Sequence, residues 1–482
     1  MTKLVATFTL LSVMGCGVAP NGASGAGAVA DEDIGVLSQA LGHSSGETIE
    51  LGGDARIRLL DLRGSSYFPA TLFKAELNAL LNAALPETLV RMSTYDWDNH
   101  WNGAVSTWFF HDDTRTFGPV CWPEMHRAAM RGVEFRGVIN THPTPDVKRW
   151  LRGDVQCAPC RDNILGFCAP MEPHDFDLRE CDSGASDGVF GACLGSHNMH
   201  AKLFTVEHAQ ASSDITVVSG HNHDYDGMRI HNHAVIIEGD AAIHDGTARF
   251  IDAMNEGARK QCPVSPADSY AETVSGDVLT TLNAEGTSRP VAKAYFWPRC
   301  GENFWESVLN RVDCSGGGEL KITMGIARKS PRPMAVARKL ASLAEAGCEV
   351  TMIGGAPGPV QQDFVKALGS KVDWVRASPG SFTPIHNKTV MINARYDGSA
   401  VRRRLVFTGS ANFSNPALDS TNEEAMLRLE HDDVYHWFDH SFEDIFDNVT
   451  FPGNWADGCF EWITWGINWG RVCTALEPDP PE

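Results

Sequence analysis

The sequence has too little positive charge for a protein whose affinity comes from a phosphate backbone. It contains 40 Lys and Arg against 61 Asp and Glu, a formal net charge of −21, so nucleic acid is a disfavoured partner. Beyond its first residues it also lacks any run long and apolar enough for a transmembrane helix. The hydrophobic fraction of 43% and the charged fraction of 21% exclude a mostly disordered chain, and 482 residues predict two structural units or one large unit built twice.

The N-terminus is typical of an export signal. A short positive region precedes an apolar stretch, residues 4–14, which is too short to span a bilayer. Residues 13–16 (VMGC) resemble a bacterial lipobox, in which the peptide is cut before the cysteine and that thiol is lipidated; an ordinary secretory signal is the alternative. We therefore predict a signal peptide over 1–15, a lipid anchor on Cys16, and a place in the bacterial cell envelope or outside the cell. Residues 16–50 have no aromatic side chain and predict a flexible tether.

The cysteine content agrees with export. Of 13 cysteines, those that remain after Cys16 form an even number, which favours disulfides in an oxidising compartment. Several fall within residues 150–196, where a Cys-x-x-Cys at 157–160 alone could indicate zinc or a redox pair. This insertion is either a lid over a site or a disulfide-linked surface segment with no catalytic part. Cys459 and Cys473 bracket a Trp-rich tail, which is a disulfide-closed loop or a membrane-facing patch.

The same order of elements occurs twice in the body of the chain. In each copy a strand, a helix and a second strand follow one another, and a glycine, Gly132 or Gly347, ends the helix. This order favours α/β layers with a mostly parallel central sheet in each half. The expected elements are a strand at 89–92, a helix at 125–131 and a strand at 133–139 in the first copy, and a strand at 320–326, a helix at 335–346 and a strand at 348–353 in the second.

Each half then reaches a His-x-Lys motif at the start of an apolar strand. One such motif is weak evidence, because 18 histidines should give it by chance on the order of once. Its recurrence at matching places is much more specific. In both copies the strand after the motif ends in small residues and an asparagine. The shared residues are His200, Lys202 and Asn222 in the first copy, and His386, Lys388 and Asn412 in the second.

These motifs resemble the signature of the phospholipase D superfamily, which is His-x-Lys, then Gly-Ser-x-Asn, then an Asn and Glu cluster, present twice. The resemblance covers roughly residues 55–448 and implies two phospholipase D-like α/β/α halves related by a pseudo-twofold axis. In that family two histidines meet between the halves, where one attacks phosphorus and the other protonates the leaving oxygen. By this resemblance His200 is the nucleophile and His386 the general acid. The implied phosphate-binding residues are Lys202, Lys388, Asn222 and Asn412.

The chemistry suits these residue types independently of the family. Two ammonium groups and two amides stabilise charge on a phosphodiester without a metal. Imidazole is a nucleophile when neutral and an acid when protonated. We therefore expect neither a cofactor nor a metal in this site. A monomer suffices, because two motif copies in one chain remove the need for a dimer.

The sequence departs from the family pattern at several places. The aspartate of the motif is replaced by Glu207 in the first copy and by Asn393 in the second, and residues 219–220 read Ser-Gly where Gly-Ser is expected. Glu423 is predicted to support the imidazole of the opposite half, whereas the corresponding first-half residue is Asn232. One histidine then lacks a carboxylate to orient it. We expect this to lower the catalytic rate more than the stability of the fold.

Two further groups of residues admit more than one interpretation. His221 with His223, and His231 with His233, are strand-spaced pairs that could bind zinc or copper, although ordinary polar or site-lining histidines are favoured. The three arginines at 402–404 could reach an anionic head group, but a solvated turn is the commoner structure for such a run.

The leading functional hypothesis is an exported, lipid-anchored phosphodiesterase that hydrolyses or transphosphatidylates phospholipid head groups through a phosphohistidine. The alternatives are a nuclease or other phosphodiesterase of the same fold, and a catalytically dead protein that binds phospholipid head groups. The expected organisation is a signal peptide (1–15), a tether (16–50), a first half (51–254) with the Cys-rich insertion (150–196), a linker (255–295), a second half (296–448) and a tail (449–482).

Overall fold

The structure is a computed structural model that describes most of both halves. The signal peptide, Cys16, residues 17–44 of the predicted tether, Asn222 and most of the Cys-rich insertion lie outside the described residues, so their predictions stay predictions. Residues 45–50, the predicted end of the tether, instead form part of a strand, β1 (Ser45–Gly52), which pairs with the next strand. The described residues are 45–52, 54–62, 72–94, 123–140, 177–181, 193–194, 199–221, 231–257, 271–276, 280–282, 288–299, 303–355, 362–377, 385–418, 422–451, 459–464 and 467–473.

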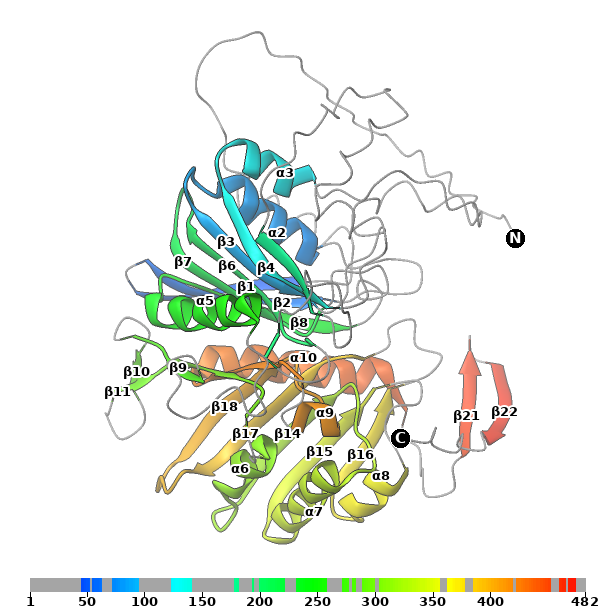
Figure 1. The fold of residues 1–482 in the computed structure, drawn as a ribbon. Helices are drawn as coiled ribbons and strands as arrows, with labels where there is room; N and C mark the ends of the chain where they lie inside the picture. The colour runs from blue at the N-terminus through cyan, green and yellow to red at the C-terminus, as the bar shows by residue number, and fades with distance from the viewer. Residues whose placement is uncertain are drawn as a thin grey trace, which may run out of the picture.

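The first half is built on a sheet whose strands run in the order β1-β2-β8-β7-β6-β3-β4-β5. Helices α2 and α3 cover one face of this sheet and α5 the other (Figure 1). The elements are β1 (Ser45–Gly52), β2 (Ala55–Leu62), α2 (Leu72–Ala83), β3 (Leu89–Thr94), α3 (Pro123–Met130), β4 (Glu134–Asn140), β5 (Asp177–Cys181), β6 (Lys202–His208), β7 (Ser213–Ser219), β8 (Asn232–Glu238) and α5 (Ala241–Glu256).

The second half repeats this plan around a sheet in the order β20-β16-β15-β14-β17-β18-β19-β12-β9, with β13 paired to β17. Helices α6, α7 and α8 cover its outer face and α10 the inner one (Figure 1). The elements are β9 (Glu272–Val274), β12 (Ala292–Phe296), α6 (Phe304–Asn310), β13 (Val312–Asp313), β14 (Gly318–Met324), α7 (Pro331–Glu345), β15 (Cys348–Gly354), α8 (Gln362–Leu368), β16 (Asp373–Ala377), β17 (Lys388–Tyr396), β18 (Arg402–Gly409), α9 (Asn415–Leu418), β19 (Ala425–Leu429), α10 (Asp432–Val449) and β20 (Thr450–Phe451).

Two small hairpins lie outside these sheets. β10 (Thr280–Leu282) pairs with β11 (Ser288–Pro290) inside the segment that we expected to be a linker, and β9 of that segment joins the second sheet. In the tail, β21 (Cys459–Thr464) pairs with β22 (Ile467–Cys473), and the register sets Cys459 directly opposite Cys473.

The duplicated α/β architecture is confirmed, but the expected mostly parallel sheets need correction. In the described part of each sheet the parallel pairs are confined to β3-β4-β5 and β14-β15-β16. The strands that carry the motifs, β6 and β17, pair antiparallel with both neighbours. The reason is connectivity: short turns join β6 to β7 and β17 to β18, and a short turn can only reverse the chain, whereas a parallel pair needs a crossover.

Local sequence explains where the helices begin and end. Gly132 and Gly347 follow α3 and α7 with φ of 91° and 103°, left-handed values that glycine adopts without strain. At the start of α5 the Asp240 carboxylate accepts a hydrogen bond from the Ile243 N–H at 2.9 Å, and Gly257 ends the helix with φ of 65°. The glycine at the end of each of these helices lets the chain turn back toward the sheet.

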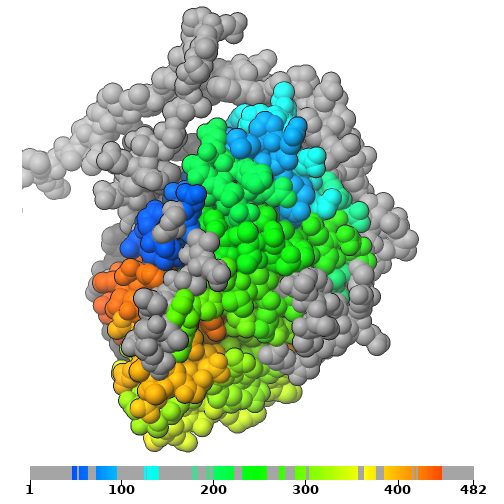
Figure 2. Space-filling view, turned by 90° about the vertical axis from the view of Figure 1, so that its left-hand side faces the viewer, coloured from blue at the N-terminus to red at the C-terminus, as the bar shows by residue number. Residues whose placement is uncertain are grey.

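The two halves meet across a shared core between the sheets. Helices α5 and α10 both lie in the layer between the sheets (Figure 1), and their apolar faces belong to one buried cluster that also includes residues from both sheets. Figure 2 shows the surface of the first half directly against that of the second. The contact is therefore built like a domain core and holds the strand ends of the two halves together.

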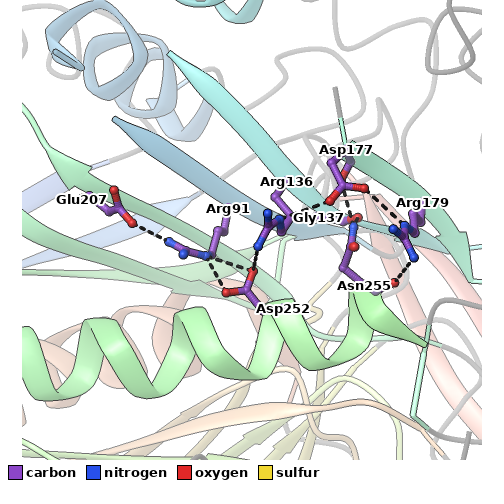
Figure 3. A network of polar contacts seen from close by, with 8 residues as sticks. All are labelled: Arg91, Arg136, Gly137, Asp177, Arg179, Glu207, Asp252 and Asn255. Carbon is purple, nitrogen blue, oxygen red and sulfur yellow. Dashed lines mark hydrogen bonds and ion pairs between the residues drawn. The ribbon is translucent and has the colours of Figure 1, made fainter. Parts of the chain in front are cut away.

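Polar contacts fix α5 to its sheet. Arg91 on β3 and Arg136 on β4 both reach Asp252 of α5, at 3.0 and 3.4 Å, as Figure 3 shows. Asn255 of the same helix donates to the carbonyl oxygens of Gly137 and Asp177 at 2.9 Å. The helix that fills the space between the halves is thus held to the sheet by charge as well as by apolar packing.

Several side predictions can be placed on this fold. Disulfides join Cys181 to Cys193 and Cys314 to Cys348. The arginine run at 402–404 begins β18 instead of forming a turn, and two of its members are paired with acidic residues: Arg403 with Glu430 at 2.5 Å and Arg404 with Asp432 at 3.2 Å. Within the described ranges, no helix has both the length and the apolarity needed to cross a membrane.

Candidate active site

The two motifs lie at related positions, and each is held by the other half of the chain. His200 stands just before β6 and His386 just before β17. The backbone N–H of His200 donates to the carbonyl oxygen of Glu423 at 2.8 Å, and that of His386 donates to the carbonyl oxygen of His231 at 2.9 Å. These reciprocal hydrogen bonds cross the interface, so the structure brings both motifs to the same place.

The lysines of the motifs are the first residues of their strands and point into the interface. Lys202 is 2% exposed and Lys388 is 1% exposed. The Nζ atom of Lys202 donates to the carbonyl oxygen of His200 at 2.6 Å, whereas that of Lys388 lies 2.8 Å from Nδ1 of His386. Two ammonium groups are thus gathered beside two imidazoles in a site nearly closed to solvent.

His200 is oriented by a buried carboxylate from the second half. Its Nδ1 lies 2.8 Å from Oε2 of Glu424, which also accepts a hydrogen bond from the Ser410 hydroxyl at 2.5 Å. The Asn422 amide donates to the other oxygen of Glu424 at 3.1 Å. Because the carboxylate accepts a hydrogen bond from Nδ1–H, the neutral ring has its lone pair on Nε2.

This geometry corrects the predicted role of Glu423. Its carboxylate accepts a hydrogen bond from the Leu194 N–H at 2.7 Å, and the contact with His200 belongs to Glu424, the next residue. Neighbouring residues in extended backbone point to opposite faces, so a shift by one moves the side chain away from the imidazole. The sequence offers two consecutive glutamates before β19, and strand alternation was the signal that could have separated them.

His386 has no carboxylate at the corresponding place. The residue after His231 is Asn232, just as Glu424 follows Glu423, and the amide nitrogen of Asn232 donates to the carbonyl oxygens of Gly220 and His386, at 3.3 Å each. Gly220 likewise occupies the place of Ser410, because Ser219 pairs with Lys202 as Gly409 lies opposite Lys388. The relay that orients His200 is therefore absent from the other side.

Burial and mutual repulsion lower the pKa values of the basic groups. Burial lowers the pKa of His200 to about 4, with Lys202 acting in the same direction and Glu424 opposing. Burial, then Lys388 and Lys202, hold the pKa of His386 well below 6.5. Burial and Lys202 also hold the pKa of the Lys388 ammonium well below its usual value. A bound anion would stabilise the charged form of each of these groups and so raise their pKa values.

Glu424 is the charge that balances the cluster. Burial alone would raise the pKa of its carboxyl, but His200, Lys202 and the hydroxyl of Ser410 outweigh burial and lower it. The group is therefore ionised at neutral pH, although it is fully buried. An ionised Glu424 therefore favours the tautomer of neutral His200 that has its proton on Nδ1 and its lone pair on Nε2.

The remaining predicted residues divide into two groups. Asn412 follows β18, 4% exposed, on the strand end that also carries Ser410. Glu207 lies at the far end of β6, where it pairs with Arg91 at 3.0 Å and accepts a hydrogen bond from the Leu89 N–H at 3.2 Å. Its contacts thus stabilise the sheet at a distance from the imidazoles. Asn222 belongs to the residues that the structure does not describe.

Comparison with known proteins supports the superfamily. Residues 318–446 match the family described as cardiolipin synthase, PLD-like domain, a segment that holds His386, Lys388, Asn412 and Glu424. No curated protein matches the chain. This match covers the second half of the chain alone, and together with the paired motifs it supports the resemblance to the phospholipase D superfamily, whose members act on phosphodiesters.

Several solved structures resemble the chain at low identity. Phosphatidylserine synthase from Haemophilus influenzae is 12% identical over 86% of this chain and 90% of its own, with a TM-score of 0.49. The phospholipase D family member Nuc from Salmonella typhimurium is 14% identical over 34% of this chain and 100% of its own, with a TM-score of 0.26. Polyphosphate kinase from Porphyromonas gingivalis is 11% identical over 83% of this chain, with a TM-score of 0.45, and the chain covers 50% of that kinase.

Proposed function

We propose that the protein is a phosphodiesterase of the phospholipase D type that acts on phospholipid head groups through a phosphohistidine intermediate. The observation that carries the proposal is the buried cluster of two imidazoles and two ammonium groups from related strand ends. Lys202 lowers the pKa of His200, of His386 and of Lys388, in a chain with a net charge of −21. A bound anion would offset this repulsion beyond what Glu424 does, and a phosphodiester fits the donors of the cluster.

The asymmetric partners assign the roles of the two histidines. Nδ1–H of His200 donates a hydrogen bond to the Glu424 carboxylate, and the pKa of His200 is about 4, so at neutral pH the ring is neutral and Nε2 carries the lone pair that attacks phosphorus. His386 lies against Lys388 and gains a proton when the charge of a bound phosphate raises its pKa. His200 is therefore the nucleophile and His386 the general acid.

The proposed reaction has two balanced steps. In the first, a bond forms between Nε2 of His200 and phosphorus while the bond to the leaving alcohol breaks, and His386 gives its proton to the departing oxygen. In the second, His386 takes a proton from water or from an alcohol, whose oxygen attacks phosphorus and releases His200. Lys202, Lys388 and Asn412 stabilise the charge on the phosphate oxygens in both steps.

Phospholipids are proposed as the substrate for two reasons. The acidic chain disfavours a polyanion such as DNA. The predicted lipid on Cys16 would hold an exported protein at a membrane, where phospholipids are concentrated. A nuclease of the same fold and a non-catalytic head-group-binding protein are the competing functions, and both make different predictions for the same experiment.

The test is denaturing mass spectrometry after an acid-free quench of the protein with mixed phospholipids and, separately, with DNA. The expected result is a phospho adduct on His200 in the phospholipid sample alone, absent from His200→Ala and retained in His386→Ala with slower turnover. An adduct formed only with DNA would establish a nuclease instead. Lipid binding without adduct or product would leave a binding protein, and an adduct on His386 would reverse the assigned roles.

A further inference from the structure

A second cluster of polar side chains lies in the interface between the halves. His231 and His233 are two residues apart and therefore point to the same face of β8, and Asp61 on β2 is the direct partner of His233 in the strand register. Ser441 of α10 reaches the cluster from the second half. All four are buried, with exposures of 1% for Asp61 and His231 and of 4% for His233 and Ser441.

The donor atoms converge on one point. Nε2 of His231 is hydrogen-bonded to the Asp61 carboxylate. Nε2 of His233 lies 3.9 Å from the same carboxylate oxygen and 3.0 Å from the Ser441 hydroxyl. One atom from each of Asp61, His231 and His233 falls within 4.8 Å of the others. Ligands of a tetrahedral zinc ion are about 3.3 Å apart, so small side-chain movements would admit the ion.

The surroundings of His233 suit a metal ligand. The amide nitrogen of Asn387 lies 3.2 Å from Nδ1 of His233 and 3.3 Å from Nε2, so this donor is not specific to either ring nitrogen. While Nε2 faces the cluster, Nδ1 lies 3.3 Å from the hydroxyl of Thr389, which can accept a hydrogen bond from Nδ1–H. A metal-bound histidine normally has its second ring nitrogen fixed by such a partner. Two imidazoles and a carboxylate, without a thiolate, form the ligand set that zinc accepts in proteins.

We infer that Asp61, His231 and His233 form a binding site for one divalent transition-metal ion of the zinc class, with Ser441 at the open side. The ion would replace the proton shared by His231 and Asp61, and so compensate the buried carboxylate more strongly than an imidazole N–H does. It would also tie β2 and β8 of the first half to α10 of the second. Because sequence alone favours ordinary polar roles for His231 and His233, this assignment rests on the contacts described above.

The proposed site lies directly behind the second motif. The carbonyl oxygen of His231 accepts the backbone hydrogen bond of His386, and Asn387 approaches the ring of His233. At the corresponding places on the other side of the interface stand Glu423 and Ala425, without a second imidazole. By fixing His231, the metal would hold in place the backbone of His386, the motif histidine that lacks a buried carboxylate.

The test measures metal content in the full-length protein, purified without chelating resin, loaded with zinc sulfate and freed of excess ion by gel filtration. Elemental analysis should give about one zinc per chain, as expected for a single site. His233→Gln, which keeps a hydrogen-bonding side chain but no imidazole, should lose it. His244→Gln is the matched control, since His244 is also buried but lies on α5 and contacts Asp245.

A second measurement needs no variant. Zinc should raise the melting temperature of the wild-type protein and a chelator should reverse the rise, because only the folded state offers the site. Cobalt in place of zinc should give visible absorption bands without a thiolate band, which separates this site from the cysteines. No zinc retained by wild type, or equal zinc in wild type and His233→Gln, overturns the proposal. None of these readouts uses a phosphodiester, so they are independent of the proposed function.

Discussion

The two motif histidines occupy related positions but have unlike neighbours. His200 has a buried carboxylate, Glu424, which is itself held by Ser410. At the matching places near His386 stand Asn232 and Gly220, whose polar atoms hydrogen-bond to each other and to the backbone. A duplicated fold has therefore kept the position of both imidazoles while giving a fixed tautomer to only one. This difference is the physical basis for separate roles.

The asymmetry is built into the packing of the interface. A Cβ added to Gly220 would lie 2.9 Å from the side-chain amide nitrogen of Asn232, the one that donates to the carbonyl oxygen of Gly220, and 3.2 Å from the carbonyl oxygen of Gly409. The first is closer than real Cβ atoms come, so a serine like Ser410 does not fit on this side without movement. The close approach of Gly220 to Gly409 lets the two strand ends meet. As a consequence, a serine and a carboxylate orient His200 but have no counterpart beside His386.

The largest expected effect comes from removing the charge of Glu424. Glu424→Gln keeps the size of the side chain but no longer favours the Nδ1–H tautomer of His200. We expect kcat to fall by about 10²–10⁴-fold, the range for losing a carboxylate that orients a histidine. Steady-state kinetics with the substrate that forms the adduct would measure it.

Glu423→Gln is the matched control for this substitution. The residue is adjacent, equally buried and changed in the same way, but its carboxylate accepts a hydrogen bond from the Leu194 N–H, and an amide oxygen can do the same. We expect kcat to change by less than about threefold. Equal losses of kcat in both variants would mean that the effect is structural and that Glu424 does not orient His200.

The second effect concerns stability at acid pH. The pKa of His200 is about 4 in the folded state against 6.5 for the free side chain. Below pH 6.5 the unfolded chain binds a proton that the folded chain excludes, so the free energy of unfolding falls as pH decreases, until folded His200 also titrates near pH 4. The contribution is roughly 3 kcal/mol at most.

Urea unfolding at neutral pH and near the lower pKa would measure this term. His200→Gln should lose less stability than wild type over the same interval, since glutamine does not titrate. His386→Gln should behave similarly, because burial also lowers the pKa of His386. If wild type and both variants lose equal stability on acidification, the buried neutral imidazoles described above are not present in solution.

Some of this site can be predicted from sequence and some cannot. The repeated His-x-Lys motifs predict both histidines and both lysines, because a local pattern is enough to recognise them. The roles of Glu423 and Glu424 depend on which way each side chain points across an interface between segments far apart in the chain. The same is true of Asp61, whose partner His231 lies 170 residues away. Long-range register is not visible in a local pattern.

The fold, like the site, is predictable from sequence only in part. Helices ended by Gly132 and Gly347, and the strands on either side of them, follow from short patterns and are confirmed by α3, β4, α7 and β15. A mostly parallel sheet is predicted for each half, whereas β6 and β17 pair antiparallel with their neighbours. Periodicity predicts a buried strand but not its partner, and a strand buried on both faces has the same apolar pattern in either direction.

The third effect tests whether the missing carboxylate can be restored. In Asn232→Asp an acidic oxygen would replace the amide nitrogen that donates to the carbonyl oxygens of Gly220 and His386. The buried acceptors would then face one another, at a cost of about 1–3 kcal/mol in the free energy of unfolding. We therefore expect lower stability and no gain in kcat. A variant that is as stable as wild type and faster would show that a symmetric site is both possible and better.

The smallest effect compares how each inner helix is attached to its sheet. In the first half Asp252 of α5 lies between Arg91 and Arg136, so Asp252→Asn leaves two guanidinium groups with one acceptor fewer. In the second half Lys321 contacts both Asp439 and Glu443 of α10, each at 2.6 Å, so Asp439→Asn leaves a second carboxylate in place. Partly exposed pairs contribute up to about 1 kcal/mol to the free energy of unfolding, and we expect Asp252→Asn to cost nearly that much and Asp439→Asn less.

Urea unfolding of both variants at low and high salt would measure these losses. A larger loss for Asp439→Asn would mean that α10 depends on its ion pairs more than α5 does, and that the two halves differ in their scaffolds as well as in their sites.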